Sequence, residues 1–488
     1  MTVNKYGRVL CSLVLGILIL ATGCAPAPTV TQAPTLAASA GASPQATVMP
    51  AATAAQAAPS DTPAPTQTAE APETVGEATA PITLTIWYYG EQEAPGCKAW
   101  LEESTALYTK LHPNIKFVLV LQSMDTLVPA FESAAAAKQG PDIQFEWTWI
   151  WGMEDAWAGN LAPINDYVSS QETSHWLDLI SRTYNNKIWS VPFYMEGYAM
   201  FYNKALLKKA GLNPDVVPQT WDDWIKYLAA LKKAGITPIV AGNKEGYEAA
   251  QYFSDLEVQT LDNPLQFQQV TIGKGKYTDP QFSSWMAQVD QLVKAGYFND
   301  DVNSIPQYQS NTMFENSQGA YLQTNTGFVK EFETKLGSDL GIMPMPKFAS
   351  GKLANAISMN AQGLAITSFS PHKQEAADFL VYLHTTDRLN SWYAHTGIPF
   401  ADDRFDTSQI TAPIEKTLYS WTQTRPNVVL EGLMPSQVWE QGLLAAGQMI
   451  FQQAGSPADA AKLMQSTLDS WRGSNDPDYK YWLIWGGG

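Results

Sequence analysis

The chain has 488 residues and a formal net charge of −17 at pH 7, with 30 lysines and arginines against 47 aspartates and glutamates. At about 150 residues per domain, this length predicts two lobes or more. The acidic balance excludes a nucleic-acid-binding protein, because such a protein needs clustered lysine and arginine to hold phosphates. The cysteine count, three, excludes a metal or redox site built from cysteine.

The N-terminus has the pattern of a secretory signal. Two cations precede an apolar run over residues 9–20, which is too short to span a bilayer. The small residues before Cys24 resemble the lipobox of bacterial lipoproteins, in which that cysteine becomes the lipidated first residue after cleavage. We therefore expect residues 1–23 to be removed and Cys24 to anchor the chain at the outer face of the cytoplasmic membrane. Cys97 is then left without a disulfide partner. The alternative is an ordinary signal peptide with a cysteine there by chance.

The segment 24–80 is rich in alanine, proline and threonine and has almost no large apolar side chains. It cannot bury enough apolar surface to offset the entropy of ordering, so we expect a disordered tether. A flexible segment of this length reaches about 40 Å on average. That reach suits a domain that is held on a membrane surface and meets a partner there.

The folded part is predicted to begin with a strand over residues 82–87, where apolar and β-branched residues alternate. Helices and strands then alternate, at 100–111, 115–121, 125–138 and 143–147. This β-α-β-α-β order predicts a parallel sheet with ligand chemistry at the carboxyl ends of its strands. The aromatic C-terminal segment, 479–485, is expected to form a buried closing strand, and a ligand site is the alternative.

The sequence has no recognisable enzyme motif. It lacks a GxSxG nucleophile elbow, an HExxH zinc motif, a Walker loop and a Rossmann fingerprint after a strand. The five histidines are scattered over predicted helix ends and loops. Most paired carboxylates lie on predicted helix faces, where solvation or capping explains them. We therefore expect no cofactor, no metal ion and no catalytic residue.

Aromatic residues gather where the first and third predicted strands end. Trp87 and Tyr89 end the first strand, and Trp147 and Trp149 follow the third. One interpretation is a strand with a tryptophan face in the core. The other is a sugar site, in which aromatic rings pack on the apolar faces of the ligand while carboxylates and amides accept its hydroxyl protons. The polar residues next to these rings are Glu91, Gln92 and Glu146.

The stretch 186–204 carries two motifs, NKIWSVPF and AMFYNK. They are similar to the G-K-x-Y-G-V-P-F crossing and the L-x-Y-N-K motif of the extracellular solute-binding proteins of ABC importers, in the sugar-binding family 1 branch. Shorter matches follow the family order over about residues 82–400, namely GPDI at 140–143, LAPI at 161–164, KAGL at 209–212, PQTW at 218–221, GAY at 319–321, GIMP at 341–344 and KQEAADFL at 373–380.

The resemblance implies an α/β fold of two lobes with a ligand cleft between them, the periplasmic-binding-protein fold of type II. The first lobe would hold residues 82–193 and 348–398, and the second would hold residues 198–343 and 403–488. The protein would be a monomer without enzymatic activity. It would deliver a mono- or oligosaccharide to the permease subunits of an ABC importer.

The resemblance also implies ligand contacts. Glu196 stands at the acidic position just after the first crossing, and Glu91 at that of a sugar-binding aspartate beyond the first strand. The loop at 147–149 would supply a stacking tryptophan and a polar contact. The stacking tryptophan of the second lobe has no counterpart near Asn325, where Phe328 is the nearest aromatic residue.

Three alternatives stay open. A polyamine or other cationic solute could occupy the same fold, held by charge and cation–π contact between tryptophans and Glu91, Glu146 and Glu196. A cell-surface carbohydrate-active enzyme would also have tryptophan subsites, together with a carboxylate pair that faces one bond. A surface adhesin without a transport partner is the third alternative.

Overall fold

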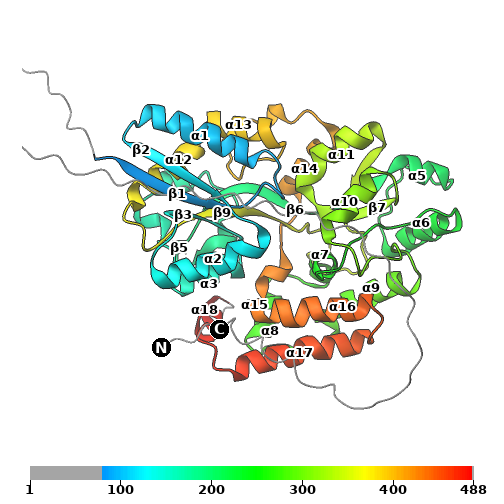
Figure 1. Cartoon of the computed structure of the whole chain (residues 1–488). Coiled ribbons are helices and arrows are strands. Elements are labelled where there is room, and N and C mark those ends of the chain that lie inside the picture. The colour runs from blue at the N-terminus through cyan, green and yellow to red at the C-terminus, as the bar shows by residue number, and fades with distance from the viewer. Residues whose placement is uncertain (1–79, 486–488) are drawn as a thin grey trace, which may run out of the picture. The chain divides into compact units, whose positions relative to one another are not determined.

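The computed structural model describes residues 80–485 (Figure 1). These residues belong to one unit, Gly76–Gly488, by their contacts. The predicted signal peptide, Cys24 and almost all of the predicted tether lie outside the described residues. Among the described helices, none combines the length and the apolar character that a membrane span requires.

A seven-stranded sheet has the strand order β2-β1-β3-β9-β6-β7, with β8 paired to β6. Its first half is parallel, as predicted, because β1 (Ile82–Tyr88) lies between β2 (Ile115–Leu121) and β3 (Ile143–Glu146) and runs in the same direction as both. Helices α1 (Cys97–Leu111) and α2 (Met124–Ala137) join these strands and lie on opposite faces of the sheet (Figure 1).

The strand β6 (Val191–Asn203) links this half to the rest of the sheet. Its beginning pairs antiparallel with β9 (Met359–Ile366), and its end pairs antiparallel with β7 (Tyr321–Asn325) and β8 (Leu340–Met343). The other edge of β9 pairs with β3. Strands β6 and β9 therefore run side by side from the parallel half into the antiparallel half, and twelve of the thirteen residues of β6 are buried.

A third segment crosses beside them. Tyr194 of β6 forms an antiparallel bridge with Phe400. Met195 N donates to Pro399 O at 3.0 Å, and Ala401 N donates to Phe193 O at 2.9 Å. Three extended segments thus connect the two halves.

The remaining helices pack around either the parallel or the antiparallel half of the sheet, and we call these two parts of the molecule its first half and its second half. The first half also contains α3 (Ile150–Trp157), α4 (Ser170–Thr173), α12 (Lys373–Leu383), α13 (Thr386–Thr396) and the small hairpin β4 (Thr183–Tyr184) and β5 (Lys187–Ile188). The second half contains α5 (Lys204–Lys209), α6 (Trp221–Lys233), α7 (Tyr247–Glu257), α8 (Leu265–Thr271), α9 (Ser284–Lys294), α10 (Gln307–Glu315), α11 (Val329–Leu336), α14 (Pro413–Thr424), α15 (Ser436–Val438), α16 (Ala445–Phe451) and α17 (Pro457–Gly473).

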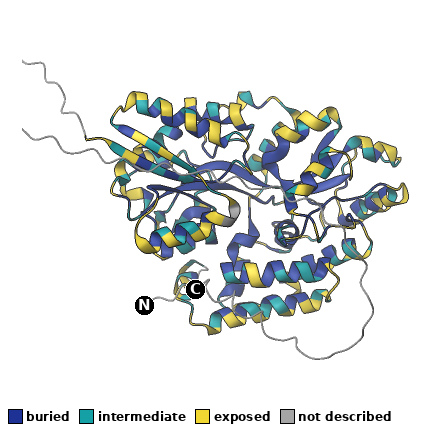
Figure 2. Cartoon of the chain, viewed as in Figure 1, coloured by how far each residue is buried: buried dark blue, intermediate teal, exposed yellow. Residues whose placement is uncertain are grey.

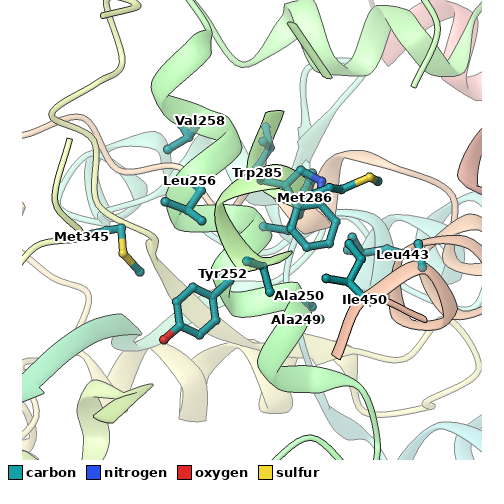
Figure 3. Close-up of a cluster of buried hydrophobic side chains, with 14 of the residues drawn as sticks. Ala249, Ala250, Tyr252, Leu256, Val258, Trp285, Met286, Met345, Leu443 and Ile450 are labelled. Carbon is teal, nitrogen blue, oxygen red and sulfur yellow. The ribbon is translucent and has the colours of Figure 1, made fainter. Parts of the chain in front are cut away.

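Burial follows this arrangement. The strands of the sheet are mostly buried, and the exposed residues lie on the outward faces of the surrounding helices (Figure 2). The core of the second half brings α7, α9 and α16 together, with Tyr252, Trp285 and Ile450 fully buried in it (Figure 3).

The expected limit of the first lobe at residue 348 is too early. Trp221 N donates to Lys347 O at 2.8 Å, and Phe348 N donates to Gln259 Oε1 at 3.0 Å, so this stretch is held by the second half. The chain returns to the first half only along β9. The family motifs end at residue 344 and do not resume before the helix at 373, so they could not locate this return. The division into lobes stays a proposal, with this limit moved to β9.

The prediction of a closing strand at the C-terminus is wrong, because these residues form the helix α18 (Tyr479–Trp485). Trp482 is fully buried, whereas Ile484 is 63% exposed. The ring of Tyr481 stacks on Trp157 of α3 at 5.3 Å, and the ring of Trp485 lies 5.7 Å from it. Aromatic residues at positions 481, 482 and 485 share one side of a helix, so α18 buries them together against the first half.

Replacement of Trp482 by alanine should lower the free energy of unfolding by about 3–5 kcal/mol, because it leaves a cavity between α18 and Trp157. Urea titration of the variant measures this loss. Ile484→Ala on the exposed side of the same helix is the matched control, and its effect should stay within about 0.5 kcal/mol. Equal losses in the two variants would contradict the orientation of α18.

Candidate functional site

Glu196 lies in the middle of β6, where the three crossing segments meet, and is only 4% exposed. Its carboxylate accepts a hydrogen bond from Asn325 Nδ2 at 2.5 Å and another from Gln362 Nε2. Asn325 ends β7 and Gln362 belongs to β9, so both sides of β6 supply a partner. The sheet therefore fixes this carboxyl group at the junction of the two halves.

A second buried carboxyl group, Glu93, reaches the same place from the loop after β1 and is 5% exposed. It accepts from Tyr194 Oη at 3.2 Å and from Trp147, and it shares a hydrogen bond with Glu196. Burial and the neighbouring charge of Glu196 raise the pKa of Glu93 well above its usual value. Burial also raises the pKa of Glu196. Each of the two carboxyl groups therefore favours its protonated form, and a proton between them satisfies their shared hydrogen bond.

Aromatic rings surround this pair. Tyr89 is buried beside Trp147, with ring centroids 5.2 Å apart. Burial raises the pKa of the phenols of Tyr89 and of Tyr308 of α10, and the nearby charges of Glu93 and Glu196 raise it further. Trp147 and Tyr308 are half-buried, whereas the carboxyl groups lie deeper. Together, Tyr89, Glu93, Trp147, Glu196, Tyr308 and Gln362 form the central cluster.

A second pair of buried acids adjoins the central cluster. Tyr198, two residues after Glu196 on the same face of β6, donates to Glu431 Oε1 at 2.9 Å. Trp439 Nε1 donates to the other oxygen of Glu431 at 2.9 Å. Asp255 of α7 accepts from Gln323 Nε2 at 2.6 Å, and burial together with the charge of Glu431 raises its pKa to about 7.

More aromatic rings lie on this side. Tyr247 of α7 stacks on Trp439 with centroids 5.9 Å apart, and Trp151 of α3 meets the same ring edge-on at 5.6 Å. Trp439 begins a π-helical turn, Trp439–Leu444. Such turns occur often at functional sites, because the extra residue redirects a side chain.

The four acids share one electrostatic property. Within residues 80–485, Glu93, Glu196, Asp255 and Glu431 form no ion pair, and their carboxyl groups are hydrogen-bonded to uncharged groups or to one another. The site thus offers buried acceptors, aromatic faces and no positive charge. A phosphate or carboxylate ligand would have to lose its hydration without gaining a cation, which is costly.

Four of the predicted site residues lie at this junction. Tyr89, Trp147 and Glu196 belong to the central cluster, and Asn325 is hydrogen-bonded to it. Phe328 lies next to it, since its ring is 5.3 Å from that of Tyr308, but it is only 9% exposed.

The other five predicted residues are placed elsewhere or are otherwise engaged. Glu91 accepts from the backbone N–H groups of Gly96 and Lys98, at 3.2 and 2.8 Å, and so caps α1 instead of facing the cluster. Gln92 is exposed and accepts from Tyr89 Oη at 3.2 Å. Trp87 is half-buried within β1 and makes no ring contact with the central cluster among the described residues.

Glu146 and Trp149 are also turned away. Phe145 contacts Tyr89 and Trp147, so the adjacent Glu146 lies on the other face of the sheet, where burial and the charge of Asp155 raise its pKa. Trp149 has φ 60° and is 5% exposed in the core. Its side chain fills the space that a Cβ at Gly432 would occupy. Neither residue faces the central cluster.

The most important residues that sequence reasoning missed are Glu93, Gln362, Glu431 and Tyr308. One of them had a visible signal. Asn360 and Gln362 stand two residues apart in the otherwise apolar strand β9, and polar residues at this spacing on a buried strand indicate a polar face. The others lie in loops or helices, where no spacing marked them.

Known proteins resemble this chain in sequence and in fold. The model of the bacterial extracellular solute-binding protein family matches residues 90–387. The chain belongs to this family. Among its relatives, an ABC transporter extracellular-binding protein of Pyrococcus horikoshii is 27% identical over 64% of this chain and 71% of its own length. The sn-glycerol-3-phosphate-binding periplasmic protein UgpB of Escherichia coli is 25% identical over 54% of this chain, which spans 57% of UgpB.

The fold is also found in solved structures. A chitin oligosaccharide binding protein superposes with a TM-score of 0.72 at 20% identity, covering 80% of this chain and 98% of its own. At this identity the likeness concerns the fold, which is the α/β fold of two-lobed solute-binding proteins.

The raised pKa of Asp255 predicts that stability depends on pH. The folded pKa of about 7 lies above the ordinary value of 3.8, so between these values the folded state holds a proton that the unfolded state has lost. The contribution of Asp255 to stability is therefore complete below about pH 4 and falls as pH rises to 7, by at most about 1.4 kcal/mol per unit.

Asp255→Asn cannot titrate, so its free energy of unfolding should decline less steeply over this range than that of the unmodified protein. Urea titrations between pH 4 and 7 measure the difference between the two slopes. Asp300→Asn at an exposed position is the control and should leave the slope unchanged. Parallel pH profiles for Asp255→Asn and the unmodified protein would refute the prediction.

Proposed function

We propose that the chain is the extracellular binding protein of an ABC importer and that its ligand is a mono- or oligosaccharide. The observation that carries this proposal is the position of Glu196. It lies at the junction of the crossing segments with amide groups on both sides, a second carboxyl group against it and aromatic rings around it. Acceptors that are ringed by aromatic faces suit a ligand with many hydroxyl donors and apolar CH faces.

In this proposal each group has a role. The rings of Trp147 and Tyr308 pack on the faces of a sugar, because these two aromatic side chains are only half-buried. Hydroxyl groups of the sugar donate to Glu93, Glu196 and the carbonyl oxygen of Gln362, and hydrogen bonds to an ionised carboxylate are the stronger ones. Tyr247 and Trp439 offer further stacking surface for a longer chain of sugars.

Ligand release requires that the site can open. Three extended crossing segments are suited to hinge motion, because a few backbone torsions can absorb a rotation of the two halves. The ligand would favour the closed state through contacts with both halves, which only that state allows. The chitin oligosaccharide binding protein supports the carbohydrate assignment by its fold. UgpB is named for a phosphate ester, a ligand that the uncompensated acids of this site disfavour.

An enzymatic role has less support. Glycoside hydrolases hold two carboxyl groups at least about 5 Å apart to flank the scissile bond. Glu93 and Glu196 share a hydrogen bond instead, so no sugar fits between them while it persists. We therefore propose binding without catalysis, by a monomer that passes its ligand to permease subunits.

The test is a thermal-shift and calorimetry screen with mono- and oligosaccharides. At least one sugar should raise the melting temperature in proportion to its occupancy, and glycerol 3-phosphate should not. Glu196→Gln should weaken the binding of that sugar by about tenfold or more, since a charge-assisted hydrogen bond becomes a neutral one.

Glu91→Gln is the matched control for this test. It should lower stability by about 1 kcal/mol through the lost helix cap and leave sugar affinity within about twofold. If no saccharide binds, the proposed function fails. If Glu91→Gln and not Glu196→Gln weakens the binding of the sugar, the proposed site at Glu196 is wrong.

We also propose that Cys24 carries the lipid anchor and that residues 24–80 tether the folded part to the membrane. In a bacterial host that processes lipoproteins, Cys24→Ser should move the protein from the membrane fraction to the soluble exported fraction. Ligand affinity should not change, because the substitution lies far from the folded part in sequence. Retention of the variant in the membrane fraction would contradict lipidation at this residue.

A further inference from the structure

The central cluster contains more hydrogen-bond acceptors than its own donors satisfy. Gln362 is 4% exposed and gives its Nε2 to Glu196, while its Oε1 has no partner within the described residues. The two ends of an amide group share one carbon atom, so this oxygen lies beside the Glu93–Glu196 pair. A buried carbonyl oxygen without a donor is rare in proteins and needs an explanation.

The same pattern occurs a second time along the site. Gln323 is fully buried and gives its Nε2 to Asp255 at 2.6 Å, and its Oε1 also lacks a partner in the part of the chain that the structure describes. Gln323 and Asn325 are two residues apart on one face of β7, about 7 Å along the strand. Asn325 donates a hydrogen bond to Glu196, so the Asn325–Glu196 pair and the Gln323–Asp255 pair lie next to each other along the sheet.

Neutral groups alone hold these acids. The hydrogen-bond donors to Glu93 and Glu196 are the phenol of Tyr194, the indole of Trp147 and the amides of Asn325 and Gln362. No lysine, arginine or histidine of residues 80–485 forms an ion pair with either carboxyl group. A pair of acids that are buried together without a cation can keep only part of its negative charge, and a proton substitutes for the missing cation.

A ligand that is itself a cation would replace that proton. An ammonium group has three donors and no acceptor, which suits the surplus of acceptors. The half-buried rings of Trp147 and Tyr308 and the buried ring of Tyr89 would face it through their negative π surfaces. A neutral hydroxyl group offers one donor and an acceptor of its own, so it meets this surplus less well.

We propose that the saccharide carries a protonated amino group, which binds between Glu93 and Glu196 and donates hydrogen bonds to both carboxyl groups and to Gln362 Oε1. This inference rests on the proposed function and specifies its ligand. A basic amino sugar, alone or within an oligosaccharide, is the class of ligand that fits. Of the other acids, Glu431 and Asp255 lie farther along the site, where a second amino group of an oligomer would bind. The titratable groups that face the pair are Tyr89, Tyr194, Tyr198 and Tyr308.

The experiment compares ligands that differ only in charge. Glucosamine and its β-linked oligomers carry protonated amines at about pH 6, and the N-acetylated forms have the same sugar skeleton without that charge. Calorimetry with the full-length protein should show that one of the amino forms binds at least tenfold more tightly than its acetylated partner. The binding heat should also differ between two buffers of different ionisation enthalpy, because the displaced proton passes to the buffer.

Two variants separate charge from shape. Glu93→Gln keeps the size of the side chain and removes the charge, so the preference for the amine should fall below about twofold and proton release should disappear. Glu102→Gln, on the exposed face of α1, removes one negative charge from the same half and should change neither. A melting curve of each variant shows whether it folds. If Glu93→Gln does not fold, the buffer dependence of the unmodified protein still decides the question.

The outcomes distinguish the inference from the proposed function. Equal affinity for the amino and acetylated forms, or binding without proton release, overturns the inference that the ligand carries a protonated amino group. The proposed carbohydrate-binding function is then unaffected. Binding of spermidine or putrescine without any saccharide overturns both. If no saccharide and no amine binds, the proposed function fails and this inference fails with it. Tighter binding of the amino form with proton release, lost in Glu93→Gln and kept in Glu102→Gln, supports the inference.

Discussion

The antiparallel pairing of β6 with β9 is the constraint on which the rest of the structure depends. Both strands are buried for almost their whole length, and their backbone hydrogen bonds carry the sheet from its parallel half into its antiparallel half. At Gly197 the two backbones approach so closely that a Cβ would lie 1.8 Å from Ser358 O. Glu196 is the adjacent residue, so the same close contact that joins the halves also fixes the carboxyl group at the centre of the site.

The elements that sequence reasoning predicted are those with a strong local signal. The first strand alternates apolar and polar residues, the second is an apolar run, and the crossing motif around Val191 marks both β6 and Glu196. These features depend on a few neighbouring residues, so they could be recognised without the structure. The parallel order of β1, β2 and β3 followed from the alternation of strands with helices.

The features that could not be predicted depend on distant partners. Glu93 differs from Glu91 only by facing inward, and that difference is decided by Tyr194 and Glu196 far along the chain. The neighbouring tryptophans predict a ligand contact at Trp149, but its backbone at φ 60° turns the ring into the core against Gly432. The aromatic residues of 479–485 fit a strand or a helix equally well by composition, and their contact with Trp157 selects the helix.

The packing of α18 has a consequence for how far the two halves can separate. The helix rests on Trp157 and Tyr184 of the first half, while α17, which precedes it, packs on α9 and α16 of the second. The link of five residues between them, 474–478, spans at most about 17 Å when fully extended. The C-terminus thus acts as a strap of fixed maximum length on the side of the molecule away from α5 and α6 (Figure 1). Opening beyond that reach would require the aromatic stack of Trp157, Tyr481 and Trp485 to come apart.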